Sequence, residues 1–101
     1  MGKKYFHITI TVNISNNIGA DKDYQIIIAS YTDDKFEGIL HVTDKDTITA
    51  GSTEVFSKEF ENVKTDKIKV FIWEGLDNMN PLTAALNLVP ENLKGKTPDF
   101  Q

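Results

Sequence analysis

Strict alternation of apolar and polar residues near the N-terminus is the feature that most constrains what this chain can fold into. Within residues 5–14, apolar side chains occupy every second position: Phe6, Ile8, Ile10, Val12 and Ile14. Successive side chains of a β-strand point to opposite faces of its sheet, so this pattern predicts a strand with one buried face and one face in water. A helix would instead need its apolar residues three and four positions apart.

Further segments of strand length follow at spacings of roughly ten residues, with turn-forming residues between them. Residues 24–31 are apolar almost throughout, which is typical of a strand covered on both faces or central in its sheet. Residues 37–43 are expected to return as the second strand of a hairpin, with a bulge at Gly38. The other predicted strands are residues 47–50, residues 53–60 with Phe56 and Phe60 facing inward, and residues 67–73.

Short strands joined by hairpin-type turns predict an all-β fold, namely an antiparallel Ig-like β-sandwich of about six or seven strands. The chain has 101 residues, the size of one domain. We assign residues 1–82 to the sandwich and residues 83–101 to a C-terminal tail or linker, because Pro90, Gly95 and Pro98 interrupt regular structure. One short helix over residues 81–88, capped by Asn80, is the only helix that the sequence suggests.

Charge and composition exclude several classes of partner and site. All eleven basic residues are lysine, and fifteen carboxylates outweigh them to give a net charge of −4. Nucleic acid and anionic membrane surfaces need a concentrated positive face, so neither is an expected partner. The chain has no cysteine, which excludes disulfides and thiolate metal sites. No apolar run approaches the roughly 18 residues of a membrane span, and no apolar export signal follows Lys3 and Lys4.

One segment, residues 67–82 with the sequence KIKVFIWEGLDNMNPL, resembles a motif in β-sandwich modules of bacterial extracellular proteins, particularly clostridial and bacillar ones. In that motif an alternating strand leads to an aromatic-aliphatic-Trp triplet, an acidic residue, a short turn and a Met-x-Pro-Leu ending. Here the triplet ends at Trp73, the acid is Glu74, and the ending begins at Met79. Residues 31–42 and 47–57 resemble the family's hairpin and its following pair of strands.

The resemblance covers residues 8–82 and departs from the family at Lys35 and Phe36, which stand where a glycine usually follows the Asp-rich turn. It implies an Ig-like or fibronectin type III-like accessory module of an extracellular or cell-surface multidomain protein. It implies no catalytic activity, so we expect a monomeric spacer, attachment or protein-interaction domain whose partners are neighbouring domains. The alternative is a carbohydrate-binding module that tethers a neighbouring enzyme to polysaccharide, which requires two exposed, coplanar aromatic rings.

Catalytic chemistry finds little support in the residues. An enzyme needs a nucleophile or base held beside an orienting partner. The two histidines, His7 and His41, each lie in a predicted strand, where an ordinary polar residue on a sheet surface is the expected role. We therefore predict no catalytic residue and no cofactor.

The aspartates fall in predicted turns, where their side chains hydrogen-bond the backbone. Asp33 and Asp34 form one such pair; Asp21, Asp23, Asp44 and Asp46 lie in two others. Calcium binding by the latter four is the alternative, because calcium takes six to eight oxygen ligands. Their spacing does not match an EF-hand loop, so no metal ligand is assigned.

Trp73 has two interpretations. Among apolar neighbours a tryptophan is normally part of the packing, so we expect it under residues 76–82, closing one end of the sandwich. The alternative is a sugar-binding platform, for which Tyr5, Tyr24 and Tyr31 are better placed to be exposed. Ligand-binding residues stay undetermined at this point.

Overall fold

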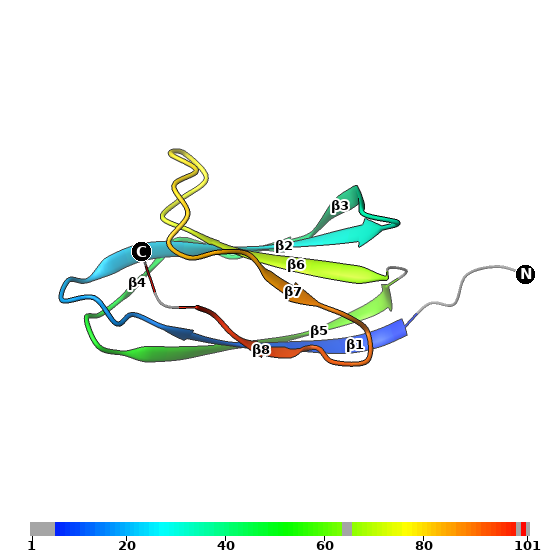
Figure 1. Ribbon diagram of the computed structural model, residues 1–101, viewed down its shortest axis with the longest axis horizontal. Helices are drawn as coiled ribbons and strands as arrows, with labels where there is room; N and C mark the ends of the chain where they lie inside the picture. The colour runs from blue at the N-terminus through cyan, green and yellow to red at the C-terminus, as the bar shows by residue number, and fades with distance from the viewer. Residues whose placement is uncertain (1–5, 64–65, 99, 101) are drawn as a thin grey trace, which may run out of the picture.

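Two β-sheets pack face to face in the computed structural model, which describes residues 6–63, 66–98 and 100 (Figure 1). The strands are β1 (Phe6–Ser15), β2 (Lys22–Thr32), β3 (Lys35–Val42), β4 (Asp46–Ile48), β5 (Thr53–Val63), β6 (Lys67–Trp73), β7 (Leu86–Leu88) and β8 (Lys94–Lys96). None of the described residues lies in a helix, so this part of the chain has no helix able to cross a membrane. The predicted all-β sandwich is confirmed, with eight strands instead of six or seven.

The smaller sheet has the strand order β5-β1-β8. Strand β1 pairs antiparallel with β5 from Phe6↔Val63 to Ser15↔Thr53, and its even-numbered residues from Ile8 onward are buried. The alternation predicted for this strand is confirmed. Strand β8 pairs with β1 in parallel. The sequence analysis expected only antiparallel pairs, so this pair is a difference from the prediction.

The larger sheet has the order β3-β2-β6-β7, and β4 pairs with the first residues of β2. Strand β2 is central, as its continuous apolar run predicted. Ser30 pairs with Gly38 whereas Tyr31 pairs with Phe36, which leaves Glu37 as an extra residue in β3. The structure therefore has a bulge at Glu37, next to Gly38, where the bulge was expected.

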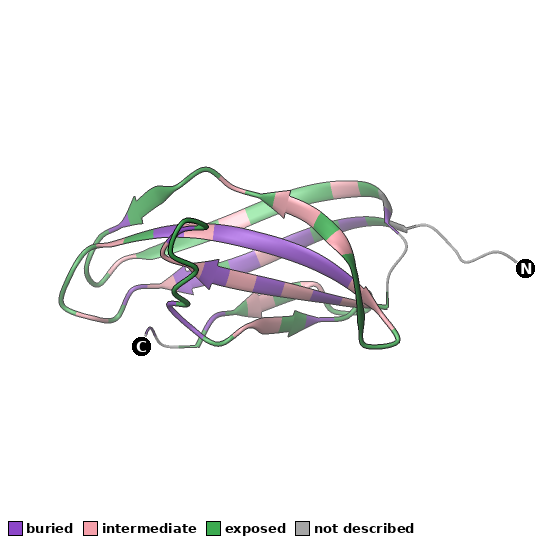
Figure 2. Cartoon of the chain, turned by 90° about the horizontal axis from the view of Figure 1, so that it is seen from above, coloured by how far each residue is buried: buried purple, intermediate pink, exposed green. Residues whose placement is uncertain are grey.

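The core lies between the inner faces of the two sheets. Figure 2 shows buried positions running along the strands that contribute it, and the side chains fully enclosed include Ile10, Ile14, Ile28, Ile68 and Ile72. Phe56 and Phe60 of β5 pack against this core, as predicted from their position in the sequence.

The segment expected to be a tail or linker contributes a strand to each sheet in its described part, namely β7 and β8. Strand β7 pairs with β6, and β8 is held to β1 by Thr11 N–H donating to Leu93 O at 3.0 Å and Thr97 N–H donating to Asn13 O at 2.9 Å. Phe100 is buried, and its N–H donates to Asn17 Oδ1. The sequence analysis did not predict these two strands, because three residues are too few to show periodicity and Lys94–Lys96 contains no apolar side chain.

The prediction of a short helix over residues 81–88 is wrong, because none of these residues is helical. Leu82 N–H donates to Ile72 O at 2.9 Å, and Pro81 forms an isolated bridge with Trp73. The chain is thus drawn back beside the end of β6 in an extended form before it becomes β7. Pairing with an existing strand prevails here over the local signal of a proline at a first helical position.

Candidate functional site

The two histidines have different surroundings. His7 is exposed on β1, with its Nε2 3.6 Å from Glu59 Oε2. His41 is not an ordinary surface residue as expected: it faces the open edge of the sandwich, with its ring stacked on Phe56 and edge-on to Phe60. Burial, and then the charge of Lys58, hold the pKa of His41 below its ordinary value near 6.5. Neither ring is placed beside a nucleophile among the described residues.

The turn aspartates mostly do what turn aspartates are expected to do. Asp21 accepts the Ala50 N–H at 3.0 Å, and Asp46 accepts the Thr47 N–H at 2.8 Å. Asp23 accepts the hydroxyl of the same threonine. Among the residues that the structure describes, no three His, Cys, Asp or Glu side chains converge so as to hold a metal ion.

Two of these aspartates, Asp33 and Asp34, form the two-residue turn between β2 and β3. Their φ angles are 53° and 61°. Positive φ at both central residues is the pattern of a type I′ hairpin turn, which asparagine, aspartate and glycine tolerate best. This turn sets the register in which Phe36 lies opposite Tyr31.

Trp73 is half-buried on the outer face of the larger sheet. Its ring centroid lies 5.6 Å from that of Phe71, and its backbone is bridged to Pro81. It packs beside the segment that follows β6, as expected, but it does not close an end of the sandwich. Of the tyrosines, Tyr24 is buried, Tyr31 is half-buried, and Tyr5 lies outside the described residues.

The register of β2 with its neighbours places apolar side chains together on that same outer face. Directly paired residues point to the same side of a sheet. Ile27 pairs with Val42 on one side and Phe71 on the other, and Gln25 pairs with Trp73. Farther along β2, Ala29 pairs with Ile39 and Tyr31 with Phe36.

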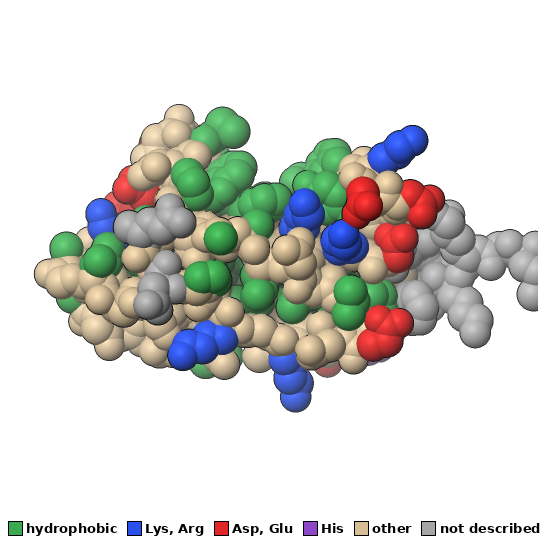
Figure 3. All heavy atoms as spheres, in the orientation of Figure 1, with side chains coloured by type: hydrophobic (Ala, Val, Ile, Leu, Met, Phe, Trp, Pro, Cys, Tyr) green, Lys and Arg blue, Asp and Glu red, His purple; other side chains and the backbone are tan. Residues whose placement is uncertain are grey.

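This face and the loop beyond β6 form a surface that we call the apolar saddle. Its members are Ile27, Phe36, Ile39, Val42, Phe71, Trp73, Leu76 and Met79. Phe36 is 57% exposed, Ile39 53% and Met79 61%. Figure 3 shows the saddle at the top of the molecule, where hydrophobic side chains gather on both sides of a hollow between the β6–β7 loop and the β2–β3 hairpin.

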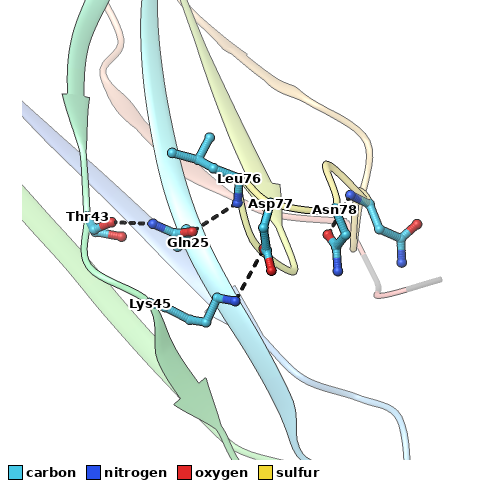
Figure 4. A network of polar contacts seen from close by, with 7 residues as sticks. Gln25, Thr43, Lys45, Leu76, Asp77 and Asn78 are labelled. Carbon is cyan, nitrogen blue, oxygen red and sulfur yellow. Dashed lines mark hydrogen bonds and ion pairs between the residues drawn. The ribbon is translucent and has the colours of Figure 1, made fainter.

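A hydrogen-bond network fixes the loop wall of the saddle to the sheet (Figure 4). Gln25 on β2 donates from Nε2 to Thr43 O at 2.9 Å, while its Oε1 accepts the Leu76 N–H at 3.0 Å. Lys45 Nζ lies 3.3 Å from Asp77 Oδ1 in the same loop. The side chain of Gln25, on the outer face of the sheet, thus holds the loop over β2. Between this loop and β6 runs a groove of about 350 Å³ lined by Phe71, Trp73, Met79 and Pro81, among others.

Charged groups stand at the border of the saddle. Lys69 Nζ lies 4.7 Å from the centre of the Tyr31 ring, a cation–π distance. Lys67 Nζ lies 2.7 Å from Asp34 Oδ1, and this contact holds the pKa of that carboxyl below its ordinary value. An apolar centre with charged groups around it is the anatomy of a protein contact surface.

Sequence reasoning missed the saddle as a site, although the signal was present. From Ile27 onward the outward-facing residues of β2 are apolar or aromatic, whereas those of β1 are polar. A stretch of strand that is apolar on both faces needs cover on both. Only the pairing register shows that Ile39 and Val42 extend the outer face of β2. Searches of family models, curated proteins and solved structures found no match to this chain.

Proposed function

We propose that this chain is a non-catalytic Ig-like accessory module of a secreted or cell-surface bacterial protein, and that it contacts a neighbouring folded domain through the apolar saddle. The observation that carries the proposal is the exposure of several large apolar side chains on one sheet face. Contiguous apolar surface of this kind marks interaction sites in folded proteins. The resemblance of residues 67–82 to modules of bacterial extracellular proteins supports the setting.

The chemistry of the saddle favours a protein surface as its occupant. Branched aliphatic side chains such as Ile39 and Val42 complement other apolar side chains but offer a sugar no hydrogen bond. A flexible methionine, Met79, adapts to irregular partner surfaces. Charged groups confined to the border add specificity without placing an unpaired charge at the centre.

Photo-crosslinking tests the proposal in the protein as its host produces it. The photoreactive residue p-benzoylphenylalanine replaces Ile39 in the saddle or, as a control, Ser57, which is exposed on the outer face of β5. We expect a crosslink to a neighbouring domain from position 39 and none from position 57. Equal crosslinking from the two positions, or none from either, would contradict the proposal.

Carbohydrate binding is the second candidate, favoured by Trp73 lying half-exposed beside Phe71 on the outer face. The two rings are tilted by 49°, and the Tyr31 and Phe36 rings by 72°, so neither pair forms a flat platform. An NMR titration with soluble cell-wall and plant oligosaccharides separates the two functions. Amide shifts confined to residues 71–73 would favour the sugar, whereas a spectrum without shifts leaves the protein-contact function.

A further inference from the structure

A second recess lies on the opposite side of β2 from the saddle, at the open edge between the two sheets. Strand β2 pairs with β4 as far as Tyr24↔Asp46 and with β3 from Ile27↔Val42. Between these points three residues, 43–45, stand opposite two residues of β2, so the chain bulges outward there. This bulge and β5 enclose a cavity of about 120 Å³, which we call the edge pocket.

Tyr24 lines the edge pocket. The residue is only 9% exposed and belongs to the core cluster. Its hydroxyl forms no hydrogen bond with the residues that the structure describes, and it is not among their fully buried, unpaired atoms, so it is open to the solvent of the pocket. Burial, then the charges of Asp46 and Glu54, raise the pKa of Tyr24. The phenol therefore stays neutral and lies in the field of both carboxylates.

Three carboxylates from three segments surround this cavity: Asp44 of the bulge, Asp46 of β4 and Glu54 of β5. The ion pairs found among the described residues involve none of them. Asp46 uses one oxygen to accept the Thr47 N–H and retains the other. The lining of the pocket thus carries three carboxylates and no lysine.

The walls between these polar groups are apolar. Ile14, Ile26, Val55 and Phe56 line the cavity. One water takes about 30 Å³ of liquid, so a cavity of this size admits only a few such groups. A fitting ligand therefore has a compact positive end, several hydrogen-bond donors and a narrow apolar stem.

We propose that the edge pocket binds an alkylammonium group, supplied by a lysine side chain of a polypeptide or by a free primary amine. The ammonium offers three donors, which suit the carboxylates and the Tyr24 phenol oxygen. Its methylene stem lies against Ile26 and Phe56. Anions are repelled by the carboxylates, and a metal ion lacks converging ligands among the described residues. This site is separate from the saddle, and its test does not depend on the proposed function.

NMR titration of the ¹⁵N-labelled full chain tests the proposal at constant ionic strength. The probes are n-butylammonium chloride and the peptide acetyl-Gly-Lys-Gly-amide; 1-butanol and the norleucine peptide are their neutral counterparts. We expect both cations to shift amides of residues 24, 43–46 and 54–56, and the neutral probes to shift them several-fold less. Tighter binding of the peptide identifies a polypeptide lysine as the source, and equal or tighter binding of butylammonium identifies a free amine.

Charge-neutral variants supply the matched control. Glu54→Gln removes a carboxylate from the pocket, whereas Glu61→Gln makes the same change farther along β5, outside it. Both side chains are exposed, so both variants are expected to keep the spectrum of the folded chain. Affinity should fall at least threefold in Glu54→Gln and stay unchanged in Glu61→Gln. Equal shifts from charged and neutral probes, no shifts at all, or an unchanged affinity in Glu54→Gln would overturn the proposal.

Discussion

The outer faces of the two sheets differ in polarity. On the smaller sheet, outward residues of β1 pair with outward residues of β5 through polar contacts, such as Thr11 with Ser57 and Ser15 with Thr53. On the larger sheet, the corresponding positions of β2 are Ile27 and Ala29, flanked by aromatic and aliphatic side chains. The outer face of the smaller sheet is therefore largely polar, and that of the larger sheet is largely apolar.

This difference indicates that the residues of a strand which face away from the core also carry information. Where they are apolar, the outer face of the sheet is apolar too. Ile27 points away from the core yet is only 3% exposed, because its neighbours on β3 and β6 enclose it. The saddle is therefore a second, shallow apolar layer on the outside of the sandwich. Its margins, Phe36 and Ile39, are exposed, and we propose that they are where a partner binds.

The largest expected effect comes from shortening the centre of that outer layer. Ile27→Ala removes an enclosed side chain and should lower the free energy of unfolding by about 2–5 kcal/mol. Asn13→Ala, at an exposed outward position of β1, should change it by less than about 0.5 kcal/mol. Urea denaturation measures both. Similar values for the two variants would mean that the outer faces do not differ as described.

The next effect concerns the turn by which the chain leaves the smaller sheet for the larger one. Asn16 is buried; its Nδ2 donates to Ala20 O at 2.8 Å and Ile48 O at 3.0 Å. Asn16→Ala leaves these carbonyls unpaired and should cost about 1–3 kcal/mol. Asn87→Ala on β7, where the side chain is exposed, is the control in the same denaturation assay. A loss no greater than that of the control would argue against this role of Asn16.

A comparable or smaller effect is expected where β8 joins the smaller sheet. A Cβ added at Gly95 would lie 2.7 Å from Leu86 Cδ2, whereas one added at Gly38 of β3 meets no atom within 4 Å. Gly95→Ala should therefore lower stability by about 1–3 kcal/mol, the usual cost of overpacking. Gly38→Ala should be neutral or stabilising. Equal thermal stability of the two variants would show that Gly95 of β8 does not lie close against Leu86 of β7.

The smallest effect is a pH dependence of stability that arises from His41. The pKa of His41 is depressed in the folded chain, so the unfolded chain binds more protons. Its contribution to stability should be complete above the ordinary value near 6.5 and should be lost as the pH falls through that value towards the folded pKa. His41→Gln should flatten the stability profile in this window. Identical profiles for wild type and His41→Gln would refute the assignment.

Much of the fold was predictable because β1 shows a period of two over its whole length and β6 shows one over its first four residues. Strands β7 and β8 were not, because three residues cannot show a period and β8 is held by backbone hydrogen bonds. The turn at Asp33 and Asp34 was predictable in place, but its positive φ angles were not. Tertiary pairing decides these features, and local propensity does not.

The candidate sites were harder to predict than the strands. Trp73 was recognised as a packing residue, but its position on the outer face depends on pairing with Gln25 across β2 and β6. The edge pocket depends on a bulge between two short strands and on Glu54, which lies in a different sheet from Tyr24. Such convergence of distant residues follows from register, which the sequence pattern specifies only where one face is strictly buried.

The most direct test of the account asks whether the saddle is covered in the native protein. Carbene footprinting of the isolated chain and of the same chain in the protein as its host produces it measures the labelling of each residue in both. The account predicts that Phe36, Ile39 and Met79 lose most of their labelling in the host protein while Ser57 keeps its own. Unchanged labelling of the saddle between the two samples would contradict the claim that this face is a contact surface.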